Sequence, residues 1–191
     1  MLNILHESGQ RIAHIVDNML SFARKTDANA ASHDLANLVE KALELAATDY
    51  NLEKQYDFKQ IVIHKVYAGN LPSLVCEGTK IQQVLLNIFI NGAQAMQAAK
   101  TEDPMFTVKT RFDEKEGMVC IEIRDNGPGM DEDERKRVFE PFFTTKPAGV
   151  GTGLGLSVSY FIITEDHGGE MAVESQPGRG AKFIVRLPLN L

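Results

Sequence analysis

The chain has 191 residues, of which 43% are hydrophobic and 24% charged, and its formal net charge at pH 7 is −6. This length suffices for one globular domain and a smaller appended segment. The acidic balance argues against a nucleic-acid-binding surface, which needs clustered Lys and Arg, and no stretch approaches the 18 uninterrupted apolar residues typical of a membrane-spanning helix.

The first predicted element is an amphipathic helix over residues 2–25. Two series of residues recur every seven positions along it: Leu5, Ile12 and Met19, and then Ser8, Ile15 and Phe22. Such a seam packs against another helix, either within the same domain or in a bundle with a second chain. The small and polar residues 26–34 that follow predict a linker.

Helices and strands then alternate to the end of the chain. Amphipathic or charged patterns predict helices over residues 35–50, 79–99, 131–138 and 154–165. Strands are predicted to begin at residues 61, 106 and 118, and EMAVES and KFIVRLPL form a closing hairpin around the turn QPGRG. Interleaved helices and strands with an antiparallel hairpin predict an α+β fold, a two-layer sandwich with one mixed sheet.

The two cysteines, Cys76 and Cys120, are far apart and lack any metal-binding spacing. Each lies in an apolar run, so we expect buried free thiols and no zinc site. Free thiols fit a reducing cytosol, and the N-terminus has no signal-peptide pattern.

A long helix carries two asparagines in the segment LLNIFINGAQAM. Asn87 and Asn91 are four residues apart and therefore share one helix face. Their amide oxygens suit a hard cation such as Mg²⁺, although a pair of buried, hydrogen-bonded asparagines remains the alternative. Gly92 weakens the helix by up to about 1 kcal/mol relative to Ala, which indicates a close approach by another group.

The segment DNGPGM, residues 125–130, follows a predicted strand. A carboxylate at that strand end, Asp125, can accept a hydrogen bond from an exocyclic amine such as adenine N6. Gly127 and Gly129 leave room for a flat ring against the backbone. A simple turn is the alternative, because these residue types favour turns.

The segment FEPFFTTK, residues 139–146, places three phenylalanines around a proline. They fit either ordinary core or the hinge of a mobile lid. Lys146 at its end could reach a phosphate as a point charge.

The segment GVGTGLGLS has glycine at four alternate positions, residues 149 to 155. It lacks the Lys-Ser/Thr of a P-loop and the spacing of a dinucleotide fingerprint. Successive glycines still let backbone N–H groups turn toward an anion, and a helix beginning near Leu154 would add its positive end. We interpret the segment as phosphate-binding, with a merely flexible loop as the alternative.

These four segments, in this order, resemble the ATP-binding domain of sensor histidine kinases. LLNIFINGAQAM is similar to that family's N box, DNGPGM to its first glycine box, FEPFFTTK to its F box, GTGLGLS to its second glycine box and PGRGAKF to its last. The resemblance covers residues 34–190 and is closest to the nitrogen-regulation branch. It implies the Bergerat ATP-binding fold, with ATP and Mg²⁺ as cofactors.

The resemblance also implies roles for individual residues. Asn87, Asn91 and Lys146 would be catalytic, and Asn91 would hold the metal. The nucleotide-binding set would be Asn87, Asn91, Asp125, Gly127, Gly129, Met130, Lys146, Gly151, Thr152, Gly153, Leu154, Gly155 and Leu156.

Two positions distinguish this chain from other proteins of that fold. Relatives that hydrolyse ATP carry Glu at the position that Asn87 resembles, and a carboxamide is a poor general base at neutral pH. This favours transfer to an imidazole over transfer to water. Ala181 stands where many relatives have a Thr that helps to bind adenine through water, so adenine recognition would depend more on Asp125.

Residues 1–26 resemble the second helix of the family's dimerisation and histidine-phosphotransfer domain. On this reading residues 27–33 form the linker and residues 34–191 the ATP-binding catalytic domain. His6 and His14 lack the neighbours of a phosphoacceptor histidine, so we expect that this chain cannot phosphorylate itself.

The resemblance therefore implies a protein-histidine kinase that uses a response-regulator receiver domain as partner. We expect a homodimer through the N-terminal helix in the full-length protein, a cytoplasmic location (including the cytoplasmic part of a membrane-bound sensor), and no contact of this segment with nucleic acid or membrane. A nucleotide-binding switch, or a serine kinase of the anti-sigma-factor type, stays open as the alternative.

Overall fold

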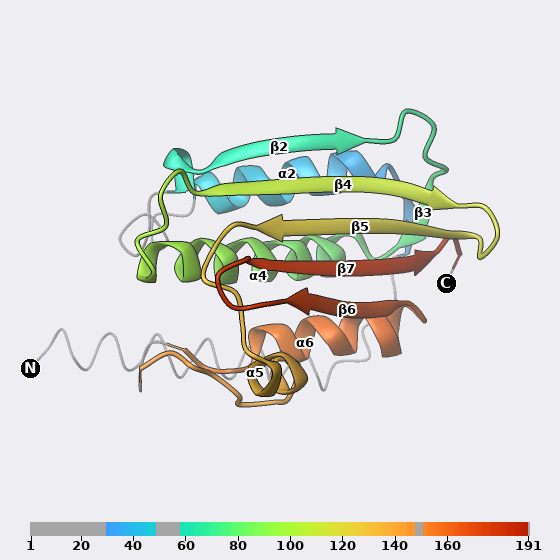
Figure 1. Cartoon of the computed structure of the whole chain (residues 1–191). Coiled ribbons are helices and arrows are strands. Elements are labelled where there is room, and N and C mark those ends of the chain that lie inside the picture. Colours follow the sequence, from blue (N-terminus) through green and yellow to red (C-terminus); the bar gives the residue numbers. More distant parts are fainter. Residues whose placement is uncertain (1–29, 49–57, 148–150, 191) are drawn as a thin grey trace, which may run out of the picture.

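The computed structural model describes residues 30–48, 58–147 and 151–190, which form a β-sheet layer and a helical layer (Figure 1). The sheet has the strand order β2-β4-β5-β7-β6. Its strands are β2 (Val62–Tyr67), β4 (Met105–Asp113), β5 (Met118–Asp125), β6 (Glu170–Ser175) and β7 (Ala181–Pro188). β2 pairs with β4 in parallel and the other neighbours are antiparallel, which confirms the predicted mixed sheet.

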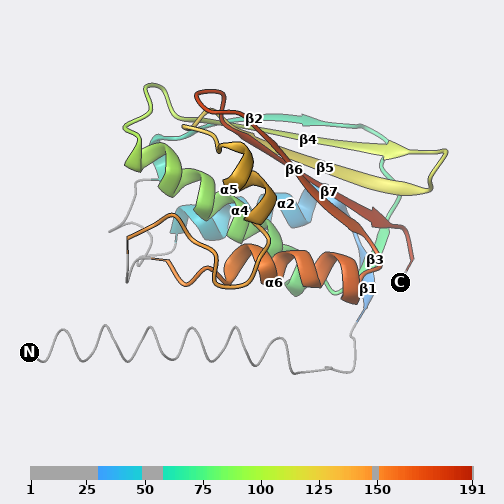
Figure 2. The same ribbon diagram turned by 60° about the horizontal axis from the view of Figure 1, so that its bottom comes forward.

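Three helices cover one face of this sheet: α2 (Leu35–Thr48), α4 (Gly78–Ala98) and α6 (Gly155–Phe161) (Figure 2). The apolar residues of α2 recur every three or four positions, so one stripe is buried against the sheet and α4. Asp34 directly precedes α2 and caps it, because its Oδ1 accepts hydrogen bonds from the backbone N–H groups of Ala36 and Asn37 at 2.7 and 3.2 Å. The short α5 (Glu132–Arg137) and the 3₁₀ turn η1 (Phe58–Gln60) lie between longer elements.

A second, two-stranded sheet was not expected from the sequence. β1 (Ala31–His33) pairs antiparallel with β3 (Leu74–Cys76), so part of the predicted linker is a strand. Each strand has three residues, too few for a periodic pattern, and only the pairing defines it. The helix predicted over residues 2–25 lies outside the described residues.

The interior between the layers is apolar. The rings of Phe58, Phe89 and Phe106 contact one another there, with centroids 5.4 to 6.3 Å apart. Cys76 and Cys120 are both buried and free, as the sequence predicted. This core fixes α4 against β4 and β5, the elements that carry the candidate site.

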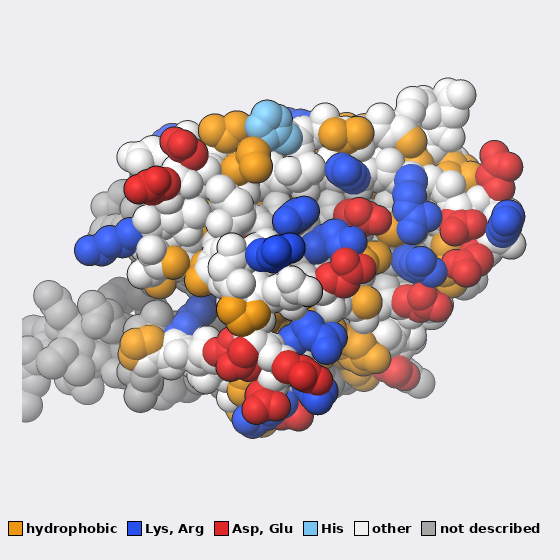
Figure 3. All heavy atoms as spheres, in the orientation of Figure 1, with side chains coloured by type: hydrophobic (Ala, Val, Ile, Leu, Met, Phe, Trp, Pro, Cys, Tyr) orange, Lys and Arg blue, Asp and Glu red, His pale blue; other side chains and the backbone are white. Residues whose placement is uncertain are grey.

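The opposite face of the sheet is charged, with Lys and Arg beside Asp and Glu (Figure 3). Ion pairs join neighbouring strands here, including Lys182–Glu174 at 2.8 Å and Arg186–Glu170 at 3.6 Å. Such alternating charge is typical of a solvated face. Of the helices within the described ranges, none is long and apolar enough to span a bilayer.

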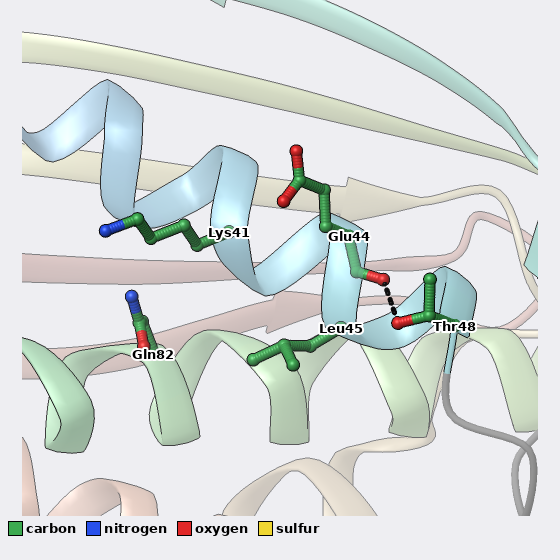
Figure 4. Close-up of a pocket in the computed structure, with 5 residues that line it drawn as sticks. All are labelled: Lys41, Glu44, Leu45, Thr48 and Gln82. Atoms are coloured by element: carbon green, nitrogen blue, oxygen red, sulfur yellow. Dashed lines mark hydrogen bonds between the residues drawn. The ribbon is translucent and has the colours of Figure 1, made fainter.

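A groove of about 420 Å³ lies between α2 and α4 (Figure 4). Its lining residues are Lys41, Glu44, Leu45, Thr48 and Gln82. None of them belongs to the motifs that the sequence singles out, so the groove is separate from the candidate site.

Candidate functional site

Asn87 joins α4 to α6. Its side-chain Nδ2 donates to the carbonyl oxygen of Gly155 and to the hydroxyl Oγ of Ser159, both at 3.1 Å. The Gly155 carbonyl can only accept a hydrogen bond, so the orientation of the Asn87 amide is fixed and its Oδ1 is left for another partner. The sequence did not point to Ser159, which is fully buried and carries no motif signal.

Asn91 lies one turn further along α4 and contacts Lys146. The Lys146 ammonium donates to Asn91 Oδ1 at 2.9 Å and also to Gln94 Oε1. Burial lowers the pKa of Lys146. The structure thus brings together two residues that the sequence proposed separately, 55 positions apart. Gln94 was missed, although its position three residues after Asn91 places it on the same helix face.

Asp125 ends β5 and is only 6% exposed. Its Oδ1 accepts hydrogen bonds from the backbone N–H groups of Gly127 at 2.9 Å and Ala181 at 3.2 Å. Burial raises the pKa of this carboxyl, against the opposite effect of the backbone N–H donors. Within the described residues no donor is recorded for Oδ2. A buried carboxylate oxygen with no recorded hydrogen bond from another described residue fits an amine donor from a ligand, as the adenine amine would supply.

Gly92 allows two layers of the fold to approach each other. A Cβ at this position would lie 2.6 Å from Cε1 of Phe106 and 3.5 Å from Cβ of Asp125. The close approach that the sequence indicated is therefore made by the protein's own core. Because Phe106 and Asp125 end up against α4, Gly92 also sets the distance between Asp125 and the asparagines of α4.

The segment after Asp125 is held by the β6–β7 hairpin. The backbone N–H of Met130 donates to Ser175 Oγ at 2.8 Å, and Ser175 Oγ donates to the carbonyl of Gly180 at 2.8 Å. The Cβ direction of Gly129 faces the backbone of Gln176. This segment is thus a turn fixed by hydrogen bonds, and Met130 packs at the edge of the core.

The second glycine segment is described from residue 151 onward. Gly153 has φ 66° and packs against the backbone of Phe142, whose N–H donates to the Gly153 carbonyl at 2.9 Å. A side chain at Gly153 would clash with that backbone. Gly151 lies beside Thr144 and Lys146, so the segment covers the lysine-bearing stretch.

The remaining predicted residues of this segment lead into α6. Thr152 Oγ1 accepts from the backbone N–H of Leu154 at 3.3 Å. Leu154 is buried, α6 begins at Gly155, and Leu156 packs at the edge of the core. The α-helix ends at Phe161 and continues as a π-helical turn (Ile162–Asp166), where the sequence predicted an unbroken helix to residue 165.

A divalent cation at this site would depend on amide oxygens. Within residues 30–48, 58–147 and 151–190, no group of three or more His, Cys, Asp or Glu could hold a metal ion. Mg²⁺ binds with few protein ligands when a phosphate and waters supply the others. The oxygens of Asn87, Asn91 and Gln94 on α4 fit that kind of site.

A comparison with protein families places the fold in a known family. The family described as histidine kinase-, DNA gyrase B- and HSP90-like ATPases matches residues 76–191, from the last residue of β3 to the end of the chain. The chain belongs to this family. The matched range includes the asparagines of α4, Asp125 and both glycine segments.

Sensor kinases are among the most similar relatives of this ATPase-family chain. It is 29% identical to the sensor histidine kinase ZraS of Escherichia coli (strain K12) over 191 residues, 100% of this chain and 38% of ZraS. It is 32% identical to sporulation kinase E of Bacillus subtilis (strain 168), over 98% of this chain and 24% of that kinase. The chain thus spans well under half the length of either relative.

Solved structures show the same fold. The catalytic domain of histidine kinase ThkA matches with a TM-score of 0.68 and 26% identity, over 85% of this chain and 97% of the domain. Full-length ShkA in complex with AMPPNP matches with a TM-score of 0.74 and 27% identity, over 97% of this chain and 37% of ShkA. The fold of this ATPase-family member is that of histidine kinase catalytic domains.

Proposed function

We propose that this chain is the ATP-binding catalytic part of a two-component sensor histidine kinase, and that it transfers the γ-phosphoryl group of Mg-ATP to a histidine on another helix. The observation that carries the proposal is the hydrogen bonding of the Asn87 side chain. Its amide is fixed between α4 and α6 by Gly155 and Ser159, and a carboxamide cannot take a proton from water at neutral pH. The site therefore supports positioning of ATP better than activation of water.

Each part of the site has a distinct role in binding. Asp125 would accept a hydrogen bond from the adenine amine through Oδ2. Lys146 would contact the phosphates as a point charge, and residues 151–156 would lie along them. Asn91 would hold Mg²⁺, which when bound neutralises charge on the β- and γ-phosphates.

The transfer itself needs no protein base. A nitrogen lone pair of a neutral imidazole attacks the γ-phosphorus, the bond from that phosphorus to the bridging oxygen breaks, and its electron pair leaves with ADP. The imidazole proton is then lost to water. Catalysis rests on placing the two reactants and on neutralising charge.

The wider organisation is also a proposal. Residues 1–26 would be the second helix of the dimerisation and phosphotransfer domain, residues 27–33 a linker, and the N-terminal helix would form the dimer. A receiver domain is the proposed partner, because ThkA is known in complex with the response regulator TrrA. The buried free thiols support a cytoplasmic location.

A transfer assay tests this function. The chain is mixed with γ-³²P-ATP and a separate helical-hairpin peptide that carries a phosphoacceptor histidine. We expect acid-labile label on the peptide, and none on a peptide with that His replaced by Ala. Acid-stable phosphoserine would instead indicate a serine kinase, and nucleotide binding with no label on any chain would indicate a nucleotide-binding switch.

A further inference from the structure

We propose that Asn91 and Gln94 together form a cation-binding amide pair, and that Lys146 and Mg²⁺ compete for it. In this structure the pair holds the Lys146 ammonium. Gln94 is then a metal-binding residue in addition to Asn91. The proposal rests on the proposed nucleotide site and deepens it.

The geometry of α4 brings the two amides to one point. Asn91 and Gln94 are three residues apart, on one face of the helix. Both side-chain oxygens accept a hydrogen bond from the same nitrogen, Lys146 Nζ, and the distance to Asn91 Oδ1 is 2.9 Å. Two oxygens that reach one ammonium nitrogen can also reach one small metal ion.

The chemistry of the two oxygens favours a hard cation. Amide oxygens carry no proton and accept from donors or coordinate metals, and Mg²⁺ prefers oxygen ligands. The ammonium of Lys146 is a compact point charge, so it is a reasonable substitute for a metal ion at this point.

The two amides that bind Lys146 are neutral, so they do not balance the charge of its ammonium group. Among the ion pairs recorded for the described residues, Lys146 has none. A partly buried ammonium held by neutral dipoles keeps a large share of its desolvation cost. A phosphate oxygen would satisfy this charge better than an amide oxygen does, so a bound triphosphate would draw Lys146 away and leave both amides to Mg²⁺.

The first experiment measures the metal-dependent part of nucleotide affinity. Binding of AMPPNP is followed by calorimetry with and without Mg²⁺ for the wild type, Gln94→Ala and Gln97→Ala. Gln97 is an exposed glutamine three residues further along α4 and is the matched control. We expect Gln94→Ala to lose at least about fivefold of the Mg²⁺-dependent gain while Mg²⁺-free affinity is kept, and Gln97→Ala to behave as the wild type.

The outcomes separate the two proposals. If Gln94→Ala keeps the full gain with Mg²⁺, the amide pair is wrong, while the proposed function stands because nucleotide still binds. If the wild type binds no adenine nucleotide, the proposed function fails, and the second experiment decides the amide pair.

The second experiment needs no nucleotide. Mg²⁺ is titrated into ¹⁵N-labelled protein, and chemical-shift changes of the side-chain NH₂ signals of Asn91, Gln94 and the control Gln97 are recorded. We expect the Asn91 and Gln94 signals to shift together while Gln97 stays in place, and at a severalfold lower Mg²⁺ concentration in Lys146→Met than in the wild type. A shift of Asn91 alone, or equal curves for the two proteins, would overturn the proposal.

Discussion

The backbone N–H of Ala181 donates a hydrogen bond to Oδ1 of Asp125 at 3.2 Å, which joins the start of β7 to the end of β5. The same oxygen accepts from Gly127. These two donors from other residues use one carboxylate oxygen, which fixes the orientation of the side chain and leaves Oδ2 for a ligand. Ala181 has no hydroxyl group with which to bind a ligand. Its backbone N–H instead orients the Asp125 carboxylate, which we expect to recognise adenine.

Replacing Asp125 by Asn tests that recognition. The Asn carbonyl can keep the hydrogen bonds from Gly127 and Ala181, so its NH₂ group would face the adenine amine, donor against donor. We expect ATP affinity to fall roughly 100-fold, since a mismatched buried polar contact costs on the order of 2–3 kcal/mol. Calorimetry gives the affinity, with Asp133→Asn on the exposed face of α5 as control. Unchanged affinity in Asp125→Asn would remove Asp125 from the adenine role.

The raised pKa of Asp125 also predicts how stability depends on pH. Burial raises this pKa above its ordinary value of 3.8, so the folded state keeps the proton to a higher pH than the unfolded state. The contribution of Asp125 to stability is then complete below 3.8 and is lost as pH rises through the folded-state pKa. The Asn side chain of Asp125→Asn cannot ionise, so this variant does not lose stability in this way as pH rises.

Urea unfolding from pH 4 to pH 7 measures that effect. We expect the unfolding free energy of Asp125→Asn to rise relative to that of the wild type as pH increases, and then to level off. A difference that stays constant across the series would show that the folded state does not shift the pKa.

Much of the fold could be predicted from periodicity. The helix predicted over residues 79–99 is α4, Gly78–Ala98, and the strand predicted from residue 118 is β5, Met118–Asp125. Both elements are long and have a regular hydrophobic pattern, so the local sequence is enough to predict whether each is a helix or a strand. β1 and β3 were not predicted because three residues carry no period, and their pairing depends on residues more than 40 positions away.

The π-helical turn after α6 is tied to a distant part of the chain, which the local sequence does not reveal. His167 is buried, its Nδ1–H donates to the carbonyl of Ile162 at 2.8 Å, and its Nε2 accepts from the backbone N–H of Glu77 at 3.2 Å. The wider turn is therefore tied to the beginning of α4. A contact across 90 positions of sequence cannot be read from a helical pattern.

The candidate site could likewise be predicted only in part from the sequence. The spacing of Asn87 and Asn91 shows that they share a helix face, and Asp125 follows a recognisable strand. The contact of Lys146 with Asn91 depends on the path of the chain between these two residues, which are 55 positions apart. Ser159 was hidden because a serine within an apolar helix gives no sign of the group that it contacts.

Gly92→Ala tests whether the absence of a side chain at Gly92 is needed for packing of the core. Its Cβ would lie 2.6 Å from Cε1 of Phe106, and that ring is packed against Phe58 and Phe89. We expect a loss of about 1–3 kcal/mol from overpacking, reduced by the better helix propensity of Ala. Urea unfolding measures it, with Gly69→Ala, where nothing lies within 4 Å, as a nearly neutral control. A net stabilisation by Gly92→Ala would contradict this account.

Asn91→Ala tests the metal role of the second asparagine. It removes an amide oxygen that would bind Mg²⁺, so we expect the Mg²⁺-dependent part of ATP affinity to disappear while Mg²⁺-free affinity falls little. Calorimetry in the presence of Mg²⁺ or of EDTA gives both values. An equal loss under the two conditions would mean that Asn91 contacts the nucleotide without the metal.

Ser159→Ala tests how the orientation of Asn87 is fixed. The Ser159 hydroxyl donates to the Gly155 carbonyl at 2.8 Å and accepts from Asn87 Nδ2, so its loss leaves that NH₂ group with one acceptor. We expect a destabilisation of about 1–2 kcal/mol, together with a shift of the Asn87 side-chain NH₂ signals in ¹⁵N NMR spectra and weaker nucleotide binding.

The matched control for that variant is Ser157→Ala. Ser157 is also buried, and its hydroxyl donates to the Leu154 carbonyl at 3.0 Å, with no hydrogen bond to Asn87. It should lower the unfolding free energy to a similar extent but leave the Asn87 signals in place. If both variants shift those signals equally, the effect comes from a general loosening of α6, and Ser159 has no special part in orienting Asn87.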